Sequence, residues 1–377
     1  MASDIDSRLS QLRARRMSEP LVIAKSEAAS AYNRGFSTDA LEIEDWEKRG
    51  SSSQRWTRYA IGTMQAVGKK YTMVSEQTGE RVANQLRDRL AKAGMDAEFK
   101  LQGSVPLDVH IKGVSYVDVL AIRMDFHTYN TTGSQALQGG YKNATQRTSS
   151  GVLSSLRQQV ESDLADAFPA AKVDITGAKA VKVSGGSLQR SVDVVPAHWY
   201  DTKEYQASGR QADRAVTIYN KKTGETIDNL PFLHIERVGS LCDSINGGLR
   251  KAIRLCKNVK ADSDRNIQLS SYDIAAIMYH ADMSVLRLGQ YSDLAVLSET
   301  QRHLDALYQD SIAAGRLWVP DGSRLIFDTS EKRDWLLWLS IEINELLKNV
   351  YQENFPNQIL WGLSPGVQRD LVKALKV

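Results

Sequence analysis

The first half of the chain mixes helical spacing with short apolar stretches that are typical of strands. Residues 53–94 carry apolar side chains at three- and four-residue intervals, which predicts helices with breaks at Gly68 and Thr78-Gly79. A second helix is predicted from about residue 79, and another over 150–167. Stretches rich in apolar and β-favouring residues predict strands at 97–101, 114–122, 171–175, 179–183 and 188–195.

After Pro231 the pattern becomes helical to the end of the chain. Helical spacing recurs over 247–260, 269–284, 293–314, 331–352 and 366–376. We therefore predict an α+β protein in three parts. These are a helical N-terminal extension (1–50), a mixed-sheet core (51–230) and a C-terminal helical domain (231–377).

Composition narrows the class of protein. The 377 residues include 48 basic and 45 acidic ones, and a net charge of +3 does not suggest a protein that coats nucleic acid. Cys242 and Cys256 make no disulfide framework and have no zinc-binding spacing. The sequence shows neither a secretory signal nor an apolar run long enough to span a membrane. We expect a cytoplasmic protein.

Two carboxylates interrupt apolar strands, and a Gly-Ser turn precedes the first of them. Asp118 lies within SYVDVLAI and Asp193 within SVDVVP, where Pro196 is expected to end the strand. A buried carboxylate is costly unless it is paired or bound to a metal, and Mg²⁺ prefers such oxygen ligands. Each aspartate alone is equally consistent with a strand-end residue that accepts backbone hydrogen bonds. Gly103-Ser104 alone is equally consistent with a plain turn.

The helical half contains a basic row and a candidate helix start. Arg250, Arg254 and Lys257 fall on one face of a predicted helix, an arrangement that is also typical of a solvated surface. Ser270 or Ser271 is expected to cap the next helix, whose first N–H groups would favour a phosphate.

In this order, the motifs over about residues 55–290 resemble the bacterial cGAS/DncV-like nucleotidyltransferases (CD-NTases) and, more distantly, the animal oligoadenylate synthases. The resemblance implies a polymerase-beta-like nucleotidyltransferase core. It also implies Mg²⁺ or Mn²⁺ as cofactor, and NTPs or dNTPs joined into a cyclic or linear oligonucleotide second messenger for antiphage defence. By resemblance, Asp118 and Asp193 carry the metal and catalysis. The implied nucleotide-binding residues are Gly103, Ser104, Lys257, Ser270, Ser271 and, as stacking platforms, Tyr200 and Tyr272. Core packing is the alternative role for both tyrosines.

One position departs from the family pattern. Tyr116 stands where the family carries its first metal-binding aspartate, and neither Asp108 nor Asp125 lies at the matching position. This leaves a catalytically degenerate relative that binds nucleotide or a partner protein as an alternative. Nucleotide transfer onto tRNA, DNA or protein is a third. An effector or regulatory protein is a further possible partner. The amphipathic stretch 331–352 is a possible contact between subunits of an oligomer.

Overall fold

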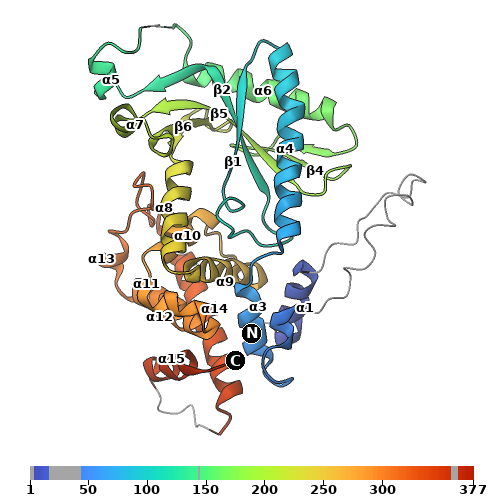
Figure 1. Cartoon of the computed structure of the whole chain (residues 1–377), viewed down its shortest axis with the longest axis vertical. Coiled ribbons are helices and arrows are strands. Elements are labelled where there is room, and N and C mark those ends of the chain that lie inside the picture. Colours follow the sequence, from blue (N-terminus) through green and yellow to red (C-terminus); the bar gives the residue numbers. More distant parts are fainter. Residues whose placement is uncertain (1–3, 17–43, 143–144, 358–363) are drawn as a thin grey trace, which may run out of the picture.

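A mixed sheet forms one lobe of the protein, drawn in the upper half of Figure 1. The computed structural model describes residues 4–16, 44–142, 145–357 and 364–377. Seven strands within these ranges pair in the order β1-β2-β5-β4-β3, with β6 on β5 and β7 on β6. The β2–β5 pair is parallel and the other pairs are antiparallel. The strands are β1 (Ala97–Gln102), β2 (Val117–Tyr129), β3 (Lys172–Asp174), β4 (Val181–Ser184), β5 (Val192–Asp201), β6 (Ala215–Tyr219) and β7 (Thr226–Asn229).

Helices α4 (Lys69–Lys92) and α6 (Ser149–Ala167) cover one face of this sheet. The predicted break at Thr78-Gly79 is wrong, because α4 runs through it without interruption. A Cβ atom on Gly79 would lie only 2.8 Å from Val117 Cγ1, so this glycine lets α4 pack closely on the sheet. The break at Gly68 is confirmed, since this residue caps the start of α4.

Pro196 does not end its strand, contrary to the prediction. It lies inside β5, opposite Ala121 of the parallel neighbour β2. On the other edge of β5, pairing with β4 stops at Val194 and pairing with β6 starts at Ala197. Pro196 therefore falls where β5 changes partners, so no ladder hydrogen bond from its missing N–H is lost on that edge.

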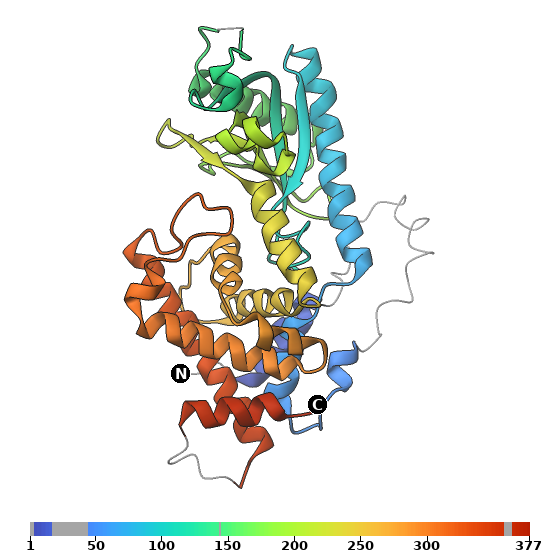
Figure 2. The same ribbon diagram turned by 60° about the vertical axis from the view of Figure 1, so that its left-hand side comes forward.

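The second lobe is helical and has its own apolar core. Its longer helices are α1 (Ile5–Arg16), α3 (Arg55–Met64), α8 (Pro231–Ser244), α9 (Gly248–Asp262), α10 (Ser271–Tyr279), α12 (Asp293–Gln309), α14 (Ser330–Asn354) and α15 (Pro365–Ala374). Figures 1 and 2 show α4 and α8 running from the sheet lobe towards the helical lobe. Among the described residues, no helix has the length and apolar character that a bilayer crossing requires.

Short helices interrupt two segments that were each predicted as one helix. The segment 269–284 breaks before α11 (Met283–Leu286), and 293–314 breaks before α13 (Ser311–Ala314). In each break an aspartate side chain caps the next helix: Asp282 accepts from two of its backbone N–H groups, and Asp310 accepts from the Ala313 N–H. This capping competes with helix continuation. The remaining short elements are η3 (Asp45–Lys48), α5 (Ser134–Leu137), α7 (Lys203–Ser208), η4 (Gln211–Asp213) and η5 (Arg287–Gln290).

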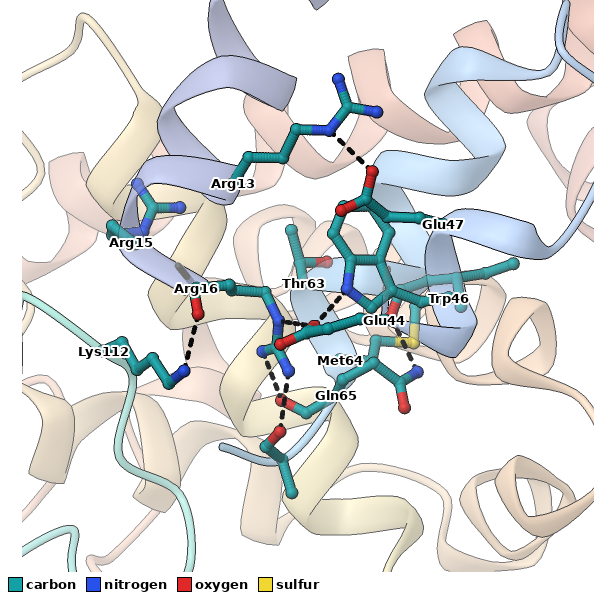
Figure 3. A network of polar contacts seen from close by, with 12 residues as sticks. Arg13, Arg15, Arg16, Glu44, Trp46, Glu47, Thr63, Met64, Gln65 and Lys112 are labelled. Carbon is teal, nitrogen blue, oxygen red and sulfur yellow. Dashed lines mark hydrogen bonds and ion pairs between the residues drawn. The ribbon is translucent and has the colours of Figure 1, made fainter. Parts of the chain in front are cut away.

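The N-terminal helix is part of the helical lobe. Leu9 and Leu12 of α1 lie in the same apolar core as α3, and residues 17–43 of the predicted extension lie outside the described residues. Arg16 at the end of α1 donates to the carbonyls of Gln65 (3.3 Å) and Ala66 (2.9 Å), in the link between α3 and α4 (Figure 3). Charge-assisted bonds of this kind fix α1 to the junction of the two lobes.

Candidate active site

Asp118 and Asp193 lie opposite each other on the parallel strands β2 and β5. Their chain neighbours Val117, Val119, Val192 and Val194 pack into the core beneath α4 and α6. Because side chains alternate between the faces of a strand, both carboxylates point to the other face. The structure therefore brings together the two residues that the sequence singled out, while their catalytic role stays a prediction.

These carboxylates belong to a polar row that crosses five strands. In register order the row is Gln102 on β1, Asp118 on β2, Asp193 on β5, Lys182 on β4 and Asp174 on β3. Residues paired in this way present their side chains to the same face. Sequence reasoning missed Gln102 and Lys182, because the only local signal for Lys182 is a polar residue alternating with valines.

The environment of the carboxylates disfavours their charged forms. Burial, and next the charge of Asp193, raise the pKa of Asp118 to about 7, against a lowering effect of Lys257. Burial also raises the pKa of Asp193, and Lys182 opposes that shift. Asp193 Oδ1 is buried without a hydrogen-bond partner within the described part of the chain. An orphaned buried carboxylate oxygen beside a second carboxylate fits a divalent cation, and Mg²⁺ commonly takes one or two carboxylates plus substrate phosphates.

Gly103 provides the turn that brings the chain past Asp118. Its φ of +76° lies in the left-handed region that favours glycine. A Cβ atom at this position would lie 2.3 Å from Asp118 Oδ2, so a side chain cannot be added without moving the carboxylate. The following loop folds back on itself, with the Val109 N–H donating to the Ser104 carbonyl (3.1 Å). Gly103-Ser104 is thus next to the carboxylate pair, as predicted.

The basic row of α9 holds this loop rather than lining a solvated face. Its three side chains donate to three successive backbone carbonyls: Arg250 Nε to Leu107 O (3.0 Å), Arg254 Nη1 to Asp108 O (2.6 Å) and Lys257 Nζ to Val109 O (2.7 Å). Asp108, the middle residue, has a φ of +53°, which is uncommon for a residue other than glycine. The loop after the Gly-Ser turn is therefore fixed in shape by the helical lobe.

Lys257 lies near the carboxylates but is already bonded. The side chain is 4% exposed, and Nζ also donates to Ser115 Oγ (3.3 Å). Burial lowers its pKa to about 7, and the charge of Asp118 works in the opposite direction. The structure thus gives Lys257 a positioning contact that the sequence did not predict, next to the site where it was expected to bind phosphate.

The start of α10 holds the two predicted serines. Ser270 caps the helix by accepting from Asp273 N (3.0 Å), and its hydroxyl donates to Asp273 Oδ2 (2.7 Å). Ser271, the first helical residue, is exposed. Lys260, which no sequence motif singled out, donates to Leu269 O (2.7 Å) and joins α9 to this helix start. Ser271 is therefore the serine whose side chain is left available.

The two tyrosines proposed as stacking platforms have other surroundings. Tyr272 stacks on His234 with 4.2 Å between ring centroids, bonds Asp321 through its hydroxyl and has Arg324 over its ring. Tyr200 lies on β5 seven residues beyond Asp193, about 23 Å at the usual rise per strand residue. The structure does not bring Tyr200 to the carboxylates, and it places Tyr272 within the packing of the helical lobe.

Comparisons with known proteins identify relatives of this chain. The chain matches no family model. It is 46% identical over 319 residues to the cyclic dinucleotide synthase CdnE of Yersinia aleksiciae, covering 84% of this chain and 82% of that protein. It is 33% identical over 314 residues to a c-di-GMP synthase of Capnocytophaga granulosa, covering 78% and 87%.

Among solved structures, the STING-associated CdnE c-di-GMP synthase of Capnocytophaga granulosa has a TM-score of 0.66 at 27% identity, over 92% of this chain and 99% of that one. The CdnE c-UMP-AMP synthase of Rhodothermus marinus shares the fold, with a TM-score of 0.60 at 20% identity over 83% of this chain. The predicted α+β nucleotidyltransferase fold with a C-terminal helical domain is confirmed. From these likenesses and the paired carboxylates, the chain belongs to the CD-NTase family of nucleotidyltransferases.

Proposed function

We propose that this protein is a divalent-cation-dependent nucleotidyltransferase that joins two nucleoside triphosphates into a cyclic dinucleotide. The observation that carries the proposal is the register of β2 and β5, which sets Asp118 beside Asp193 next to the Gly103-Ser104 turn. The names of the relatives support a cyclic product, since one is a cyclic dinucleotide synthase and others are c-di-GMP synthases.

In the proposed reaction, a ribose 2′- or 3′-hydroxyl attacks the α-phosphate of a nucleoside triphosphate, and pyrophosphate leaves. A second such transfer within the linear product closes the ring. A Mg²⁺ or Mn²⁺ ion held by Asp118 and Asp193 would supply Lewis-acid chemistry at the reacting oxygens. The same carboxylates help to remove the proton of the attacking hydroxyl. Ser104 and the first N–H groups of α10, with Ser271, are proposed to bind the triphosphate.

Lys257 is proposed to act at this site mainly through the loop that it holds. Its ammonium group balances charge near Asp118, and its bond to Val109 O keeps the residues after Ser104 in place. A second-messenger role in antiphage defence completes the proposal, and this part rests on the family resemblance alone.

Tyr116 supports a second candidate, a relative that binds nucleotide without turnover. It is 42% exposed and lies two residues before Asp118, where a further carboxylate would complete a three-carboxylate site. Nucleotide binding without metal-dependent turnover would favour this candidate. Restored turnover in Tyr116→Asp would show that the missing carboxylate is what limits the protein.

The test is incubation with all four NTPs and dNTPs plus Mg²⁺ or Mn²⁺, followed by analysis of nucleotide products and of pyrophosphate. We expect a cyclic dinucleotide from the natural protein and none from Asp193→Ala. Asp166→Ala, which changes an exposed aspartate on α6, is the matched control and should behave like the natural protein. Equal product from Asp193→Ala would refute the site.

A further inference from the structure

Lys182 and Tyr116 form a pair on the flank of the carboxylates. Lys182 is the β4 residue in register with Asp193. Its Nζ lies 3.5 Å from the centroid of the Tyr116 ring, within the range of a cation–π contact. Tyr116 precedes β2 directly and is two residues from Asp118. An ammonium group is therefore held by an aromatic ring beside the two acidic side chains.

The donors around the carboxylates limit how many divalent cations this site can hold. Within the described ranges, no third His, Cys, Asp or Glu joins Asp118 and Asp193 to make a three-ligand group. On the β1 side the row continues with Gln102, a neutral amide, and on the β4 side with Lys182, a cation. Two carboxylates carry a charge of −2, which one divalent cation neutralises. A second cation would have only Asp174 of this row, which lies beyond Lys182 and already accepts hydrogen bonds from Thr176, and it would be repelled by the ammonium group.

We propose that Asp118 and Asp193 hold a single divalent cation, and that Lys182, fixed against Tyr116, occupies the adjoining flank so that the protein does not bind a second one. This inference rests on the proposed function, because it concerns the same carboxylate pair. It makes Lys182 a further residue of the active site, one that sets the number of metal ions.

The test counts Mn²⁺ ions bound by the full chain without nucleotide, using electron paramagnetic resonance to measure free Mn²⁺ during a titration. The Asp118→Asn/Asp193→Asn double variant gives the baseline of unrelated surface sites. Above that baseline we expect one Mn²⁺ in the natural protein and two in Tyr116→Asp/Lys182→Met. Tyr116 and Lys182 are both at least partly exposed, so these changes open no cavity in the core.

Lys182→Met alone gives a second readout. It should still bind one Mn²⁺, roughly fivefold more tightly, because a nearby positive charge has been removed. Lys172→Met is the matched control, since Lys172 is an exposed lysine on β3 outside the polar row, and it should leave the affinity unchanged.

Two ions in the natural protein, none above the baseline, or equal counts in the natural protein and Tyr116→Asp/Lys182→Met would overturn the inference. A product assay on the same preparations separates it from the proposed function. Cyclic dinucleotide formation with two bound ions would refute the ion count and leave the proposed activity standing. One bound ion without cyclic dinucleotide formation would refute the proposed activity and leave the ion count standing.

Discussion

Each lobe contains a carboxylate site, fully buried in the helical lobe and partly buried in the sheet lobe, and the two sites differ in their hydrogen-bond partners. Asp262, at the end of α9 in the helical lobe, accepts hydrogen bonds from Tyr59 Oη (2.7 Å) and from both Nη atoms of Arg15. In the sheet lobe, Asp193 Oδ1 is buried and has no partner within the described residues, and Asp118 lies beside it. The first site uses its carboxylate to join α1, α3 and α9, whereas the second leaves charge available for a ligand.

Asp273 sharpens the contrast, because its burial is compensated. Burial alone would raise its pKa, but hydrogen bonds from Ser270 and Arg324 bring the pKa below its usual value. The pKa of Asp118, by contrast, is raised to about 7. Burial therefore does not by itself mark a functional carboxylate. What marks it is burial without protein partners.

The largest expected effect on stability comes from removing the compensated carboxylate. Asp262→Ala leaves Arg15 Nη1 and the buried hydroxyl of Tyr59 without their acceptor, and Arg15 Nη2 keeps only its bond to Asn258 Oδ1 (3.3 Å). We expect the free energy of unfolding to fall by about 3–5 kcal/mol, the usual cost of breaking a buried ion pair. Chemical denaturation measures it, with the exposed Asp264→Ala as control. A loss below 1 kcal/mol would mean that Asp262 is not a structural anchor.

Displacing Asp118 should reduce turnover by about a hundredfold, the typical cost of a misplacement of about 1 Å. Gly103→Ala does this, because its Cβ atom would lie 2.3 Å from Asp118 Oδ2. Gly94→Ala is the matched control, since Gly94 has a similar φ of +71° but no heavy atom within 4 Å of an added Cβ. Both variants should lose some stability, and only Gly103→Ala should lose activity. Equal activity in the two variants would show that the Gly-Ser turn does not position Asp118 for catalysis.

Stability should depend on pH through Asp118. In the metal-free folded protein its carboxyl keeps its proton up to about pH 7, whereas the unfolded chain releases it near the ordinary value of 3.8. The unfolded state thus binds fewer protons between these values, so stability falls as pH rises from about 4 to 7.

Asp118→Asn should remove this decline, changing the difference between pH 4 and pH 7 by about 3 kcal/mol. Denaturation curves with a chelator present measure it, and Asp166→Asn serves as the exposed control. Parallel profiles of unfolding free energy against pH in Asp118→Asn and the natural protein would show that the pKa of Asp118 is not raised.

The smallest effect is stabilisation by Mg²⁺. At a concentration ten times the dissociation constant, binding to the folded state alone adds about 1.4 kcal/mol. For a chain of this size we expect Tm to rise by about 2 °C. Thermal unfolding with and without Mg²⁺ measures it, and Asp193→Ala should show no rise. An equal rise in both proteins would place the ion elsewhere.

The sequence predicted the parts of the site that depend on local pattern. Asp118 and Asp193 interrupt apolar strands, and Gly103 follows a strand, so each could be read from its neighbours. The contribution of Lys182 could not, because it depends on how β4 registers against β5. The contact of Lys257 with Val109 O depends on a loop carbonyl turned towards another lobe. Periodicity carries no information on either arrangement.

Three fold features were missed for related reasons. Pro196 inside β5 is tolerated only because its strand changes partners there, which is a property of the whole sheet. The strands β6 and β7 are short and were not predicted at all. Tyr200 was proposed as a stacking platform from the family resemblance, but an extended strand places it far from Asp193 in space.

The most direct test of the contrast between the lobes is to measure turnover and the free energy of unfolding together for Asp193→Asn. We predict that cyclic dinucleotide formation falls about a thousandfold, since metal-ion catalysis is worth several kcal/mol. Stability should be unchanged or higher, because a neutral amide replaces a carboxylate whose pKa is raised by burial and whose Oδ1 has no hydrogen-bond partner within the described residues. Turnover near that of the natural protein, or a loss of stability like that of Asp262→Ala, would contradict the account.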